Sequence, residues 1–137
     1  MSDKIVISSN TKNLAQVRNF IANSLSLADI NSRIIDQVVL SVDEACTNII
    51  KHTYKFEDGH NIEIFIMVNN DSINISIIYS GSAFDPNSKD VPDMTEYFKK
   101  YKVGGLGIPL IKKFIDKIEY VHTDNNLNKL TLIKFLS

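Results

Sequence analysis

The sequence has little of what marks several specialised classes of protein. Its 137 residues include one cysteine and no tryptophan, and 15 basic side chains balance 16 acidic ones for a formal net charge of −1. This balance provides no basic surface for nucleic acid and no polybasic patch for a membrane. The single cysteine, Cys46, cannot form an internal disulfide, and the apolar helical pattern around it favours a buried, inert thiol.

Long apolar runs are also missing. No stretch approaches the roughly 20 apolar residues of a membrane-spanning helix. The first residues, MSDKIVISSN, lack the charged-then-apolar order of a secretion signal. We therefore expect a cytoplasmic protein. The length and the apolar fraction of 44% favour one globular domain over residues 1–137, with a core that needs no disulfide or metal.

Changes in hydrophobic period predict the order of the elements. Residues 4–9 read as a strand, and helical spacing predicts helices over about 14–25, after a cap at Asn10 or Thr11, and about 31–52. Strict alternation predicts a hairpin over 61–79, followed by a loop over 80–92 and a short polar helix over 93–102 that could form a lid. An amphipathic helix over 108–118 and a hairpin over 119–136 complete the order. Hairpins with helices between them predict an α+β two-layer sandwich, in which a mixed, mostly antiparallel sheet packs on helices.

One candidate site lies on the second predicted helix. Glu44, Asn48 and His52 are spaced four residues apart, so they lie roughly along one stripe. A carboxylate and an amide oxygen one turn apart suit magnesium chemistry, because the amide can bind the cation while the carboxylate orients or deprotonates a nucleophile. Taken alone, the same spacing fits a solvated polar stripe, and His52 fits an ordinary residue at a helix C-terminus.

Two glycine segments could approach a ligand closely. Gly81 opens the stretch G-S-A-F-D-P directly after a predicted strand, where an ordinary turn also fits. The cluster Gly104-Gly105-Leu106-Gly107 precedes a helix with Pro109 in its first turn, which suits backbone N–H groups facing an anion, although a flexible hinge fits too. The cluster is not a Walker A loop, because no Gly-Lys-Ser/Thr follows, and no βαβ pattern makes it a Rossmann loop.

The three segments together, in this order, resemble the GHKL ATPase superfamily. More narrowly, the chain resembles the RsbW/SpoIIAB-type anti-sigma-factor serine kinases over nearly its whole length. Glu44-Ala45-Cys46-Thr47-Asn48 with His52 and Tyr54 matches the family's N-box, and Gly104 to Ile111 matches its second glycine box. The segment 128–132 resembles the last strand, whose threonine, here Thr131, faces the base in this family.

The resemblance implies a Bergerat-type ATPase fold and a protein serine/threonine kinase that uses ATP and Mg²⁺. It makes Glu44 the base for a partner's serine hydroxyl and Asn48 the magnesium ligand, with the 104–107 amides around the phosphates. The implied partners are an anti-anti-sigma protein of the STAS type, a sigma factor and a second copy of the chain, without nucleic acid or membrane. The implied nucleotide-binding residues are Asn48, His52, Tyr79, Gly81, Phe84, Gly104, Gly105, Leu106, Gly107 and Thr131.

One position departs from the family pattern. The first glycine box of the family begins Asp-x-Gly, and this aspartate accepts a hydrogen bond from the adenine amino group, whereas the triplet here is Tyr79-Ser80-Gly81. Losing a charge-assisted hydrogen bond costs roughly 1.5–3 kcal/mol, or about one to two decades of affinity. A kinase and a non-catalytic partner-binding module with weakened or lost nucleotide binding therefore both stay open. An interaction domain unrelated to sigma factors is a third possibility, because a fold does not fix a partner.

Overall fold

The computed structural model describes residues 2–81 and 107–136. The predicted loop over 80–92 and the predicted lid over 93–102 therefore fall almost wholly outside the described residues. The elements are, in chain order, β1 (Ser2–Ser8), the 3₁₀ turn η1 (Thr11–Asn13), α1 (Leu14–Leu27), α2 (Ser32–Asn48), the π-helical turn η2 (Ile49–Thr53), β2 (Asn61–Val68), β3 (Ser72–Ser80), α4 (Gly107–Phe114), β4 (Lys117–His122) and β5 (Leu127–Phe135).

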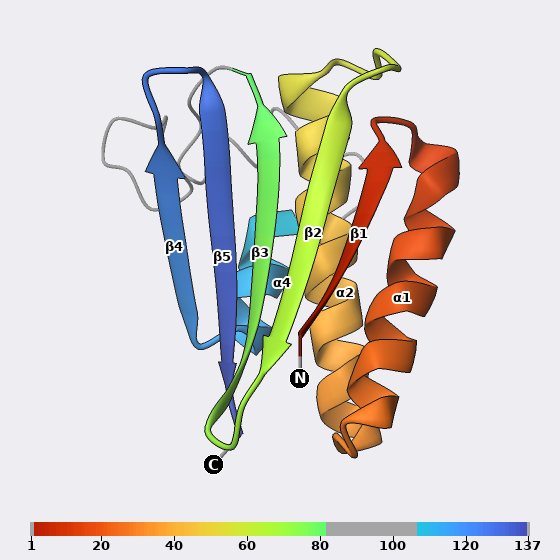
Figure 1. The fold of residues 1–137 in the computed structure, drawn as a ribbon, viewed down its shortest axis with the longest axis vertical. Helices are drawn as coiled ribbons and strands as arrows, with labels where there is room; N and C mark the ends of the chain where they lie inside the picture. Colours follow the sequence, from red (N-terminus) through yellow and green to blue (C-terminus); the bar gives the residue numbers. More distant parts are fainter. Residues whose placement is uncertain (1, 82–106, 137) are drawn as a thin grey trace.

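The five described strands form one sheet in the order β1-β2-β3-β5-β4. All four pairings between them are antiparallel. Helices α1, α2 and α4 lie on one face of this sheet, with α2 passing behind β2 and α4 behind β3 (Figure 1). The predicted α+β two-layer sandwich is confirmed. No described element covers the other face, which we call the open face.

Local sequence signals place the helix starts where they were predicted. The Asn10 side chain accepts a hydrogen bond from the Lys12 amide at 2.9 Å and caps η1. The Asn31 side chain accepts one from the Arg33 amide at 2.8 Å and caps α2. In each case a side-chain oxygen satisfies an amide that has no partner within its own helix.

Isoleucines on the two central strands form the middle of the core. Because side chains alternate between the faces of a strand, one face of the β2–β3 hairpin is entirely apolar. Each buried isoleucine of this size contributes roughly 1.5–3 kcal/mol relative to an exposed one. The side chains concerned are 0–1% exposed: Ile62, Ile64, Ile66, Ile73, Ile75 and Ile77.

The helix after the glycine cluster is shorter than predicted. We expected it to run to residue 118, but α4 ends at Phe114, and Lys117 and Ile118 belong to β4. The Ile115 amide still donates to the Ile111 carbonyl at 2.8 Å, and the next amide, that of Asp116, donates to Ile133 in β5 at 3.0 Å. Pairing with β5 therefore ends the helix. The apolar spacing of residues 108–118 cannot predict this end, because it depends on a contact with a distant strand.

Cys46 is buried on α2, as its place in the sequence predicts. Its side chain is fully inaccessible, and burial raises the pKa of the thiol to about 12, with the nearby Asp43 charge adding to the effect. A thiol with so high a pKa is not a nucleophile near neutral pH. Cys46 is a small apolar core residue.

We predict that two neighbouring isoleucines of β3 contribute very differently to stability. Ile77→Ala should lower the free energy of unfolding by about 2–5 kcal/mol, because it opens a cavity in the core. Ile78, the matched control, is half-buried on the open face, and Ile78→Ala should cost less than half as much. Urea unfolding at low protein concentration measures both. Equal losses would contradict the assignment of the two faces.

Candidate functional site

The candidate site lies at one end of the sandwich, where β3 ends beside the last turns of α2 and its extension η2 (Figure 1). Helix α4 packs against α2. This end of the molecule gathers Glu44, Asn48 and His52 from the helical layer, Tyr79 from β3 and Gly81 directly after it. The segments are far apart in the sequence, and the antiparallel order of the sheet brings them together.

On α2, Glu44 and Asn48 lie one turn apart, and both are half-buried. A fully solvated polar stripe, the alternative left open by the sequence, does not fit this burial. The same turns carry structural contacts: Asp43 forms a 2.8 Å ion pair with Arg18, and the Thr47 hydroxyl donates to the Asp43 carbonyl at 2.7 Å. These contacts fix the backbone from which Glu44 and Asn48 project.

Directly after Asn48 the helix widens into the π-helical turn η2. The Tyr54 amide donates to the Ile49 carbonyl at 3.1 Å, a bond to the fifth residue back. Because a π turn needs more residues per turn than an α turn, it reduces the sideways drift of His52 relative to Asn48. Isolated π turns inside helices are frequent at functional sites.

His52 is half-buried in this turn. Burial lowers the pKa of His52 below its ordinary value of 6.5, and the adjacent Lys51 charge lowers it further. The imidazole is therefore neutral at neutral pH, where it can both donate and accept a hydrogen bond.

At the end of β3, Tyr79 points towards the helices and is 2% exposed. Gly81 follows with φ +132°, in the region that favours glycine. A Cβ at Gly81 would lie 2.5 Å from the Thr53 methyl carbon. We expected glycine here to let a ligand approach the backbone closely. In the structure, it is η2 that lies close to the Gly81 backbone.

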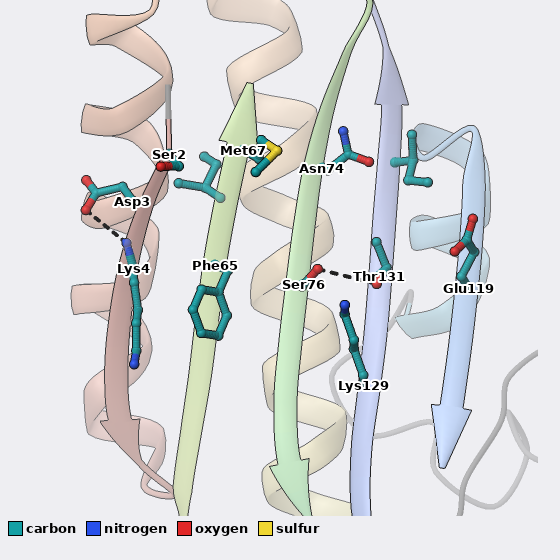
Figure 2. A pocket seen from close by; sticks show the side chains of 12 residues that line it. Ser2, Asp3, Lys4, Phe65, Met67, Asn74, Ser76, Glu119, Lys129 and Thr131 are labelled. Carbon is teal, nitrogen blue, oxygen red and sulfur yellow. Dashed lines mark hydrogen bonds between the residues drawn. The ribbon is translucent and has the colours of Figure 1, made fainter. Parts of the chain in front are cut away.

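Thr131, which the resemblance predicts to face the base, does not lie with this group. Leu130 and Leu132 of β5 face the helices, and the alternation of the strand turns Thr131 to the open face. There its hydroxyl lies 3.4 Å from that of Ser76, in a hollow of about 680 Å³ between β1 and β4 (Figure 2). The sheet itself separates this hollow from Glu44 and Asn48.

The polar residue that β5 does bring to this end of the sheet is Asn128, which the sequence reasoning missed. It pairs with Tyr79 across the sheet and is 0% exposed. Its amide nitrogen donates to the Tyr79 and Gly81 carbonyls at 3.2 and 3.1 Å, and its oxygen accepts from Tyr120 and, at 2.8 Å, from His122. Because alternate residues of a strand share a face, Leu132 and Leu130 predict that Asn128 also faces the helices.

Only one of the remaining predicted site residues, Gly107, lies in the part of the chain that the structure describes. Phe84, Gly104, Gly105 and Leu106 lie outside the described residues. Gly107 is the first residue of α4, so a helix does begin at the end of the glycine cluster. Among the described residues, no three histidine, cysteine or acidic side chains gather as metal ligands, and no helix is both long and apolar enough to cross a membrane.

Comparison with known proteins agrees with the fold and with the motif order. The model of the histidine kinase-like ATPase domain matches residues 7–134. The serine-protein kinase RsbW of Bacillus pumilus is 30% identical over 126 residues, which span 82% of this chain and 76% of that protein. RsbW of Bacillus cereus strain AH187 is 34% identical over 66% of this chain and 58% of its own length. RsbW of Listeria monocytogenes strain HCC23 is 27% identical over 73% of this chain and 70% of its own.

The fold, the position of Glu44 and Asn48 on α2 and the helix that begins at Gly107 define a histidine kinase-like ATPase domain. The chain belongs to this family and, within it, to the RsbW-like group that its motifs indicated.

We predict that His52 makes stability depend on pH. The unfolded chain takes up a proton near pH 6.5 and the folded chain resists it, so stability is lost as the pH falls below about 6.5. His52→Gln should therefore reduce the loss of stability between about pH 7.5 and about pH 5. Urea unfolding of both proteins measures this, and His60 and His122 are common to both. Identical pH profiles would contradict the prediction.

Proposed function

We propose that this protein binds ATP with Mg²⁺ and phosphorylates a serine on a partner protein. The observation that carries the proposal is the half-buried Glu44–Asn48 pair, one turn apart on α2 beside the end of β3, in a chain whose relatives are named serine-protein kinases. Asn48 supplies the kind of oxygen that Mg²⁺ prefers. Because one amide oxygen does not complete a magnesium site, phosphate oxygens and water would supply the other ligands.

The residues divide into a phosphate half and a base half. Glu44 would accept the proton of the serine hydroxyl, and Asn48 would hold the cation. Amides of residues 104–107, of which Gly107 is the first residue of α4, would face the phosphates, because a helix N-terminus favours negative charge. Bound ATP·Mg²⁺ would supply the phosphoryl group and neutralise its charge. His52, Tyr79, Gly81 and Phe84 would line the base half.

The proposed partners are those of the RsbW-like group. The protein whose serine is modified would be an anti-anti-sigma protein of the STAS type, and the client held in check would be a sigma factor. On this proposal the chain regulates transcription in the cytoplasm by choosing between the two partners.

We predict that Asn48→Ala weakens binding of Mg·ATP by about tenfold or more, because the cation loses its protein ligand. Without Mg²⁺, Asn48→Ala and the unmodified protein should bind ATP alike. Asn74→Ala, an amide removed from the open face, serves as the matched control and should change neither value. Isothermal calorimetry measures all three proteins with and without the cation.

The same titrations separate the kinase from the alternative. Absence of ATP and ADP binding at millimolar nucleotide would leave the non-catalytic partner-binding module. Tyr79→Asp should tighten adenine nucleotide binding if this position meets the base. A loss instead would mean that the Tyr79 ring itself holds the base, for example by stacking.

We also propose that the open face is the surface on which two copies of the chain associate. Its charges include the pairs Lys4–Glu63, at 3.5 Å, and Lys117–Glu119, at 3.2 Å, so most of its charge is already paired, and Lys129 adds one further cation. A five-stranded face measures on the order of 600 Å², and two such faces reach the lower end of standard interfaces. Five large apolar side chains on it are 43–56% exposed: Val6, Met67, Val121, Leu127 and Phe135.

We predict that Met67→Lys converts a dimer into a monomer, because it places an ammonium group within this apolar surface. Leu40→Lys, on the outer surface of α2 where the leucine is 47% exposed, is the matched control and should leave the dimer intact. Sedimentation velocity measures the mass in solution. An unmodified protein that stays monomeric at about 100 μM would contradict the proposal, since biological dimers of this size are commonly tighter.

A further inference from the structure

The backbone at the end of β3 is held by side chains from two different elements. Three successive carbonyl groups, those of Tyr79, Ser80 and Gly81, each accept a hydrogen bond from a side chain. The Gly81 amide donates to the Asn126 carbonyl at 2.8 Å. A simple turn closes with one backbone hydrogen bond, so this segment is fixed more firmly than a turn requires.

On the helical side, the segment is held by Tyr54. Its hydroxyl donates to the Ser80 carbonyl at 2.7 Å, and its ring stacks on His60 with centroids 4.2 Å apart and planes 7° apart. Tyr54 is 6% exposed, so the stack and the surrounding core leave its ring little freedom. Burial raises the pKa of Tyr54, against the opposing effect of the Ser80 hydrogen bonds, so the hydroxyl remains a donor at neutral pH.

On the sheet side, the segment is held by Asn128. Both donors of its amide nitrogen are used, one on the Tyr79 carbonyl and one on the Gly81 carbonyl. Its oxygen accepts from the Tyr120 hydroxyl and from the His122 ring. Reversing the amide would place its oxygen against the Tyr79 and Gly81 carbonyl oxygens, neither of which can donate. The orientation of Asn128 is therefore determined by these two contacts.

Gly81 lies between the two supports. A Cβ added to Gly81 would lie only 2.5 Å from the Thr53 methyl carbon, so the backbone here is packed closely against η2. Its φ of +132° adds a second constraint on the residue type. The segment at the end of β3 is thus fixed on the helical side, on the sheet side and at its own amide.

We propose that Tyr54 and Asn128 are positioning residues for nucleotide binding, which hold the Tyr79–Gly81 backbone in its bound conformation before the nucleotide arrives. The inference rests on the proposed function, because it assigns a purpose to this backbone in the same site. A segment ordered in advance loses less conformational entropy on binding, so the two side chains raise affinity without touching the nucleotide.

The test uses Tyr54→Phe, which keeps the ring and its stack and removes only the hydroxyl. Calorimetry well below the unfolding temperature should show Mg·ATP binding about three- to tenfold weaker, the effect of one hydrogen bond lost from the support. Ser76→Ala, which removes a hydroxyl from the open face of the same strand, is the matched control and should bind as the unmodified protein does. A purely structural role would lower the unfolding temperature of Tyr54→Phe and leave the affinity of the folded protein unchanged, which would overturn the proposal.

Hydrogen exchange of the Gly81 amide in the nucleotide-free protein gives a second, independent measurement. Tyr54→Phe should exchange this amide faster, because its segment is held on one side only, and Ser76→Ala should not. Unchanged exchange would overturn the proposal even if ATP binding is never observed. If the unmodified protein binds no ATP but exchange responds as expected, the proposed function is overturned, while the fixing of the β3 end by Tyr54 stands.

Asn128→Asp, which replaces the two donors with an oxygen, should weaken binding further. If it does not fold, Tyr54→Phe alone decides.

Discussion

The packing of the isoleucine face of β2 and β3 on α2 fixes the position of the candidate site. Ile73, Ile75 and Ile77 are buried against the helices, so the strand alternation carries Tyr79 to the same side and to the end of α2. A register shift of one residue would expose all three isoleucines, at a cost that no contact of the site could offset. The site therefore takes its geometry from the core rather than from its own polar contacts.

Patterns carried by neighbouring residues could be predicted from the sequence, and contacts between distant residues could not. The alternation of 61–79, the caps at Asn10 and Asn31 and the buried Cys46 all follow from local spacing. The end of α4 at Phe114 depends on a bond between Asp116 and β5, which no helical period contains. In the same way, the π turn after Asn48 belongs to a segment whose Tyr54 side chain bonds to Ser80, 26 residues away.

β5 brings Asn128 rather than Thr131 to the helix side of this end of the sheet, and the alternation that decides this could be read from the sequence. A motif match placed the threonine, whereas the alternation of β5 decides which residues face the helices. The burial of Leu130 and Leu132 shows which positions of β5 face the helices, and Asn128, two residues before Leu130, is the next such position. Where a motif match and a strand period disagree, the period is the stronger guide, because reversing it would expose the core.

The base half of the site explains why such firm backbone support has a purpose. Tyr79 buries a ring at the position where the family resemblance implies an aspartate, and Asn128 directs both of its donors to protein carbonyls. If ATP is the ligand, these groups leave little charge-assisted recognition of the base, so affinity depends on the phosphates, the cation and a low entropic cost of binding. Tyr54 and Asn128 act on that last quantity. On the proposed function, a site with few specific contacts to the base gains most from backbone that is already in place.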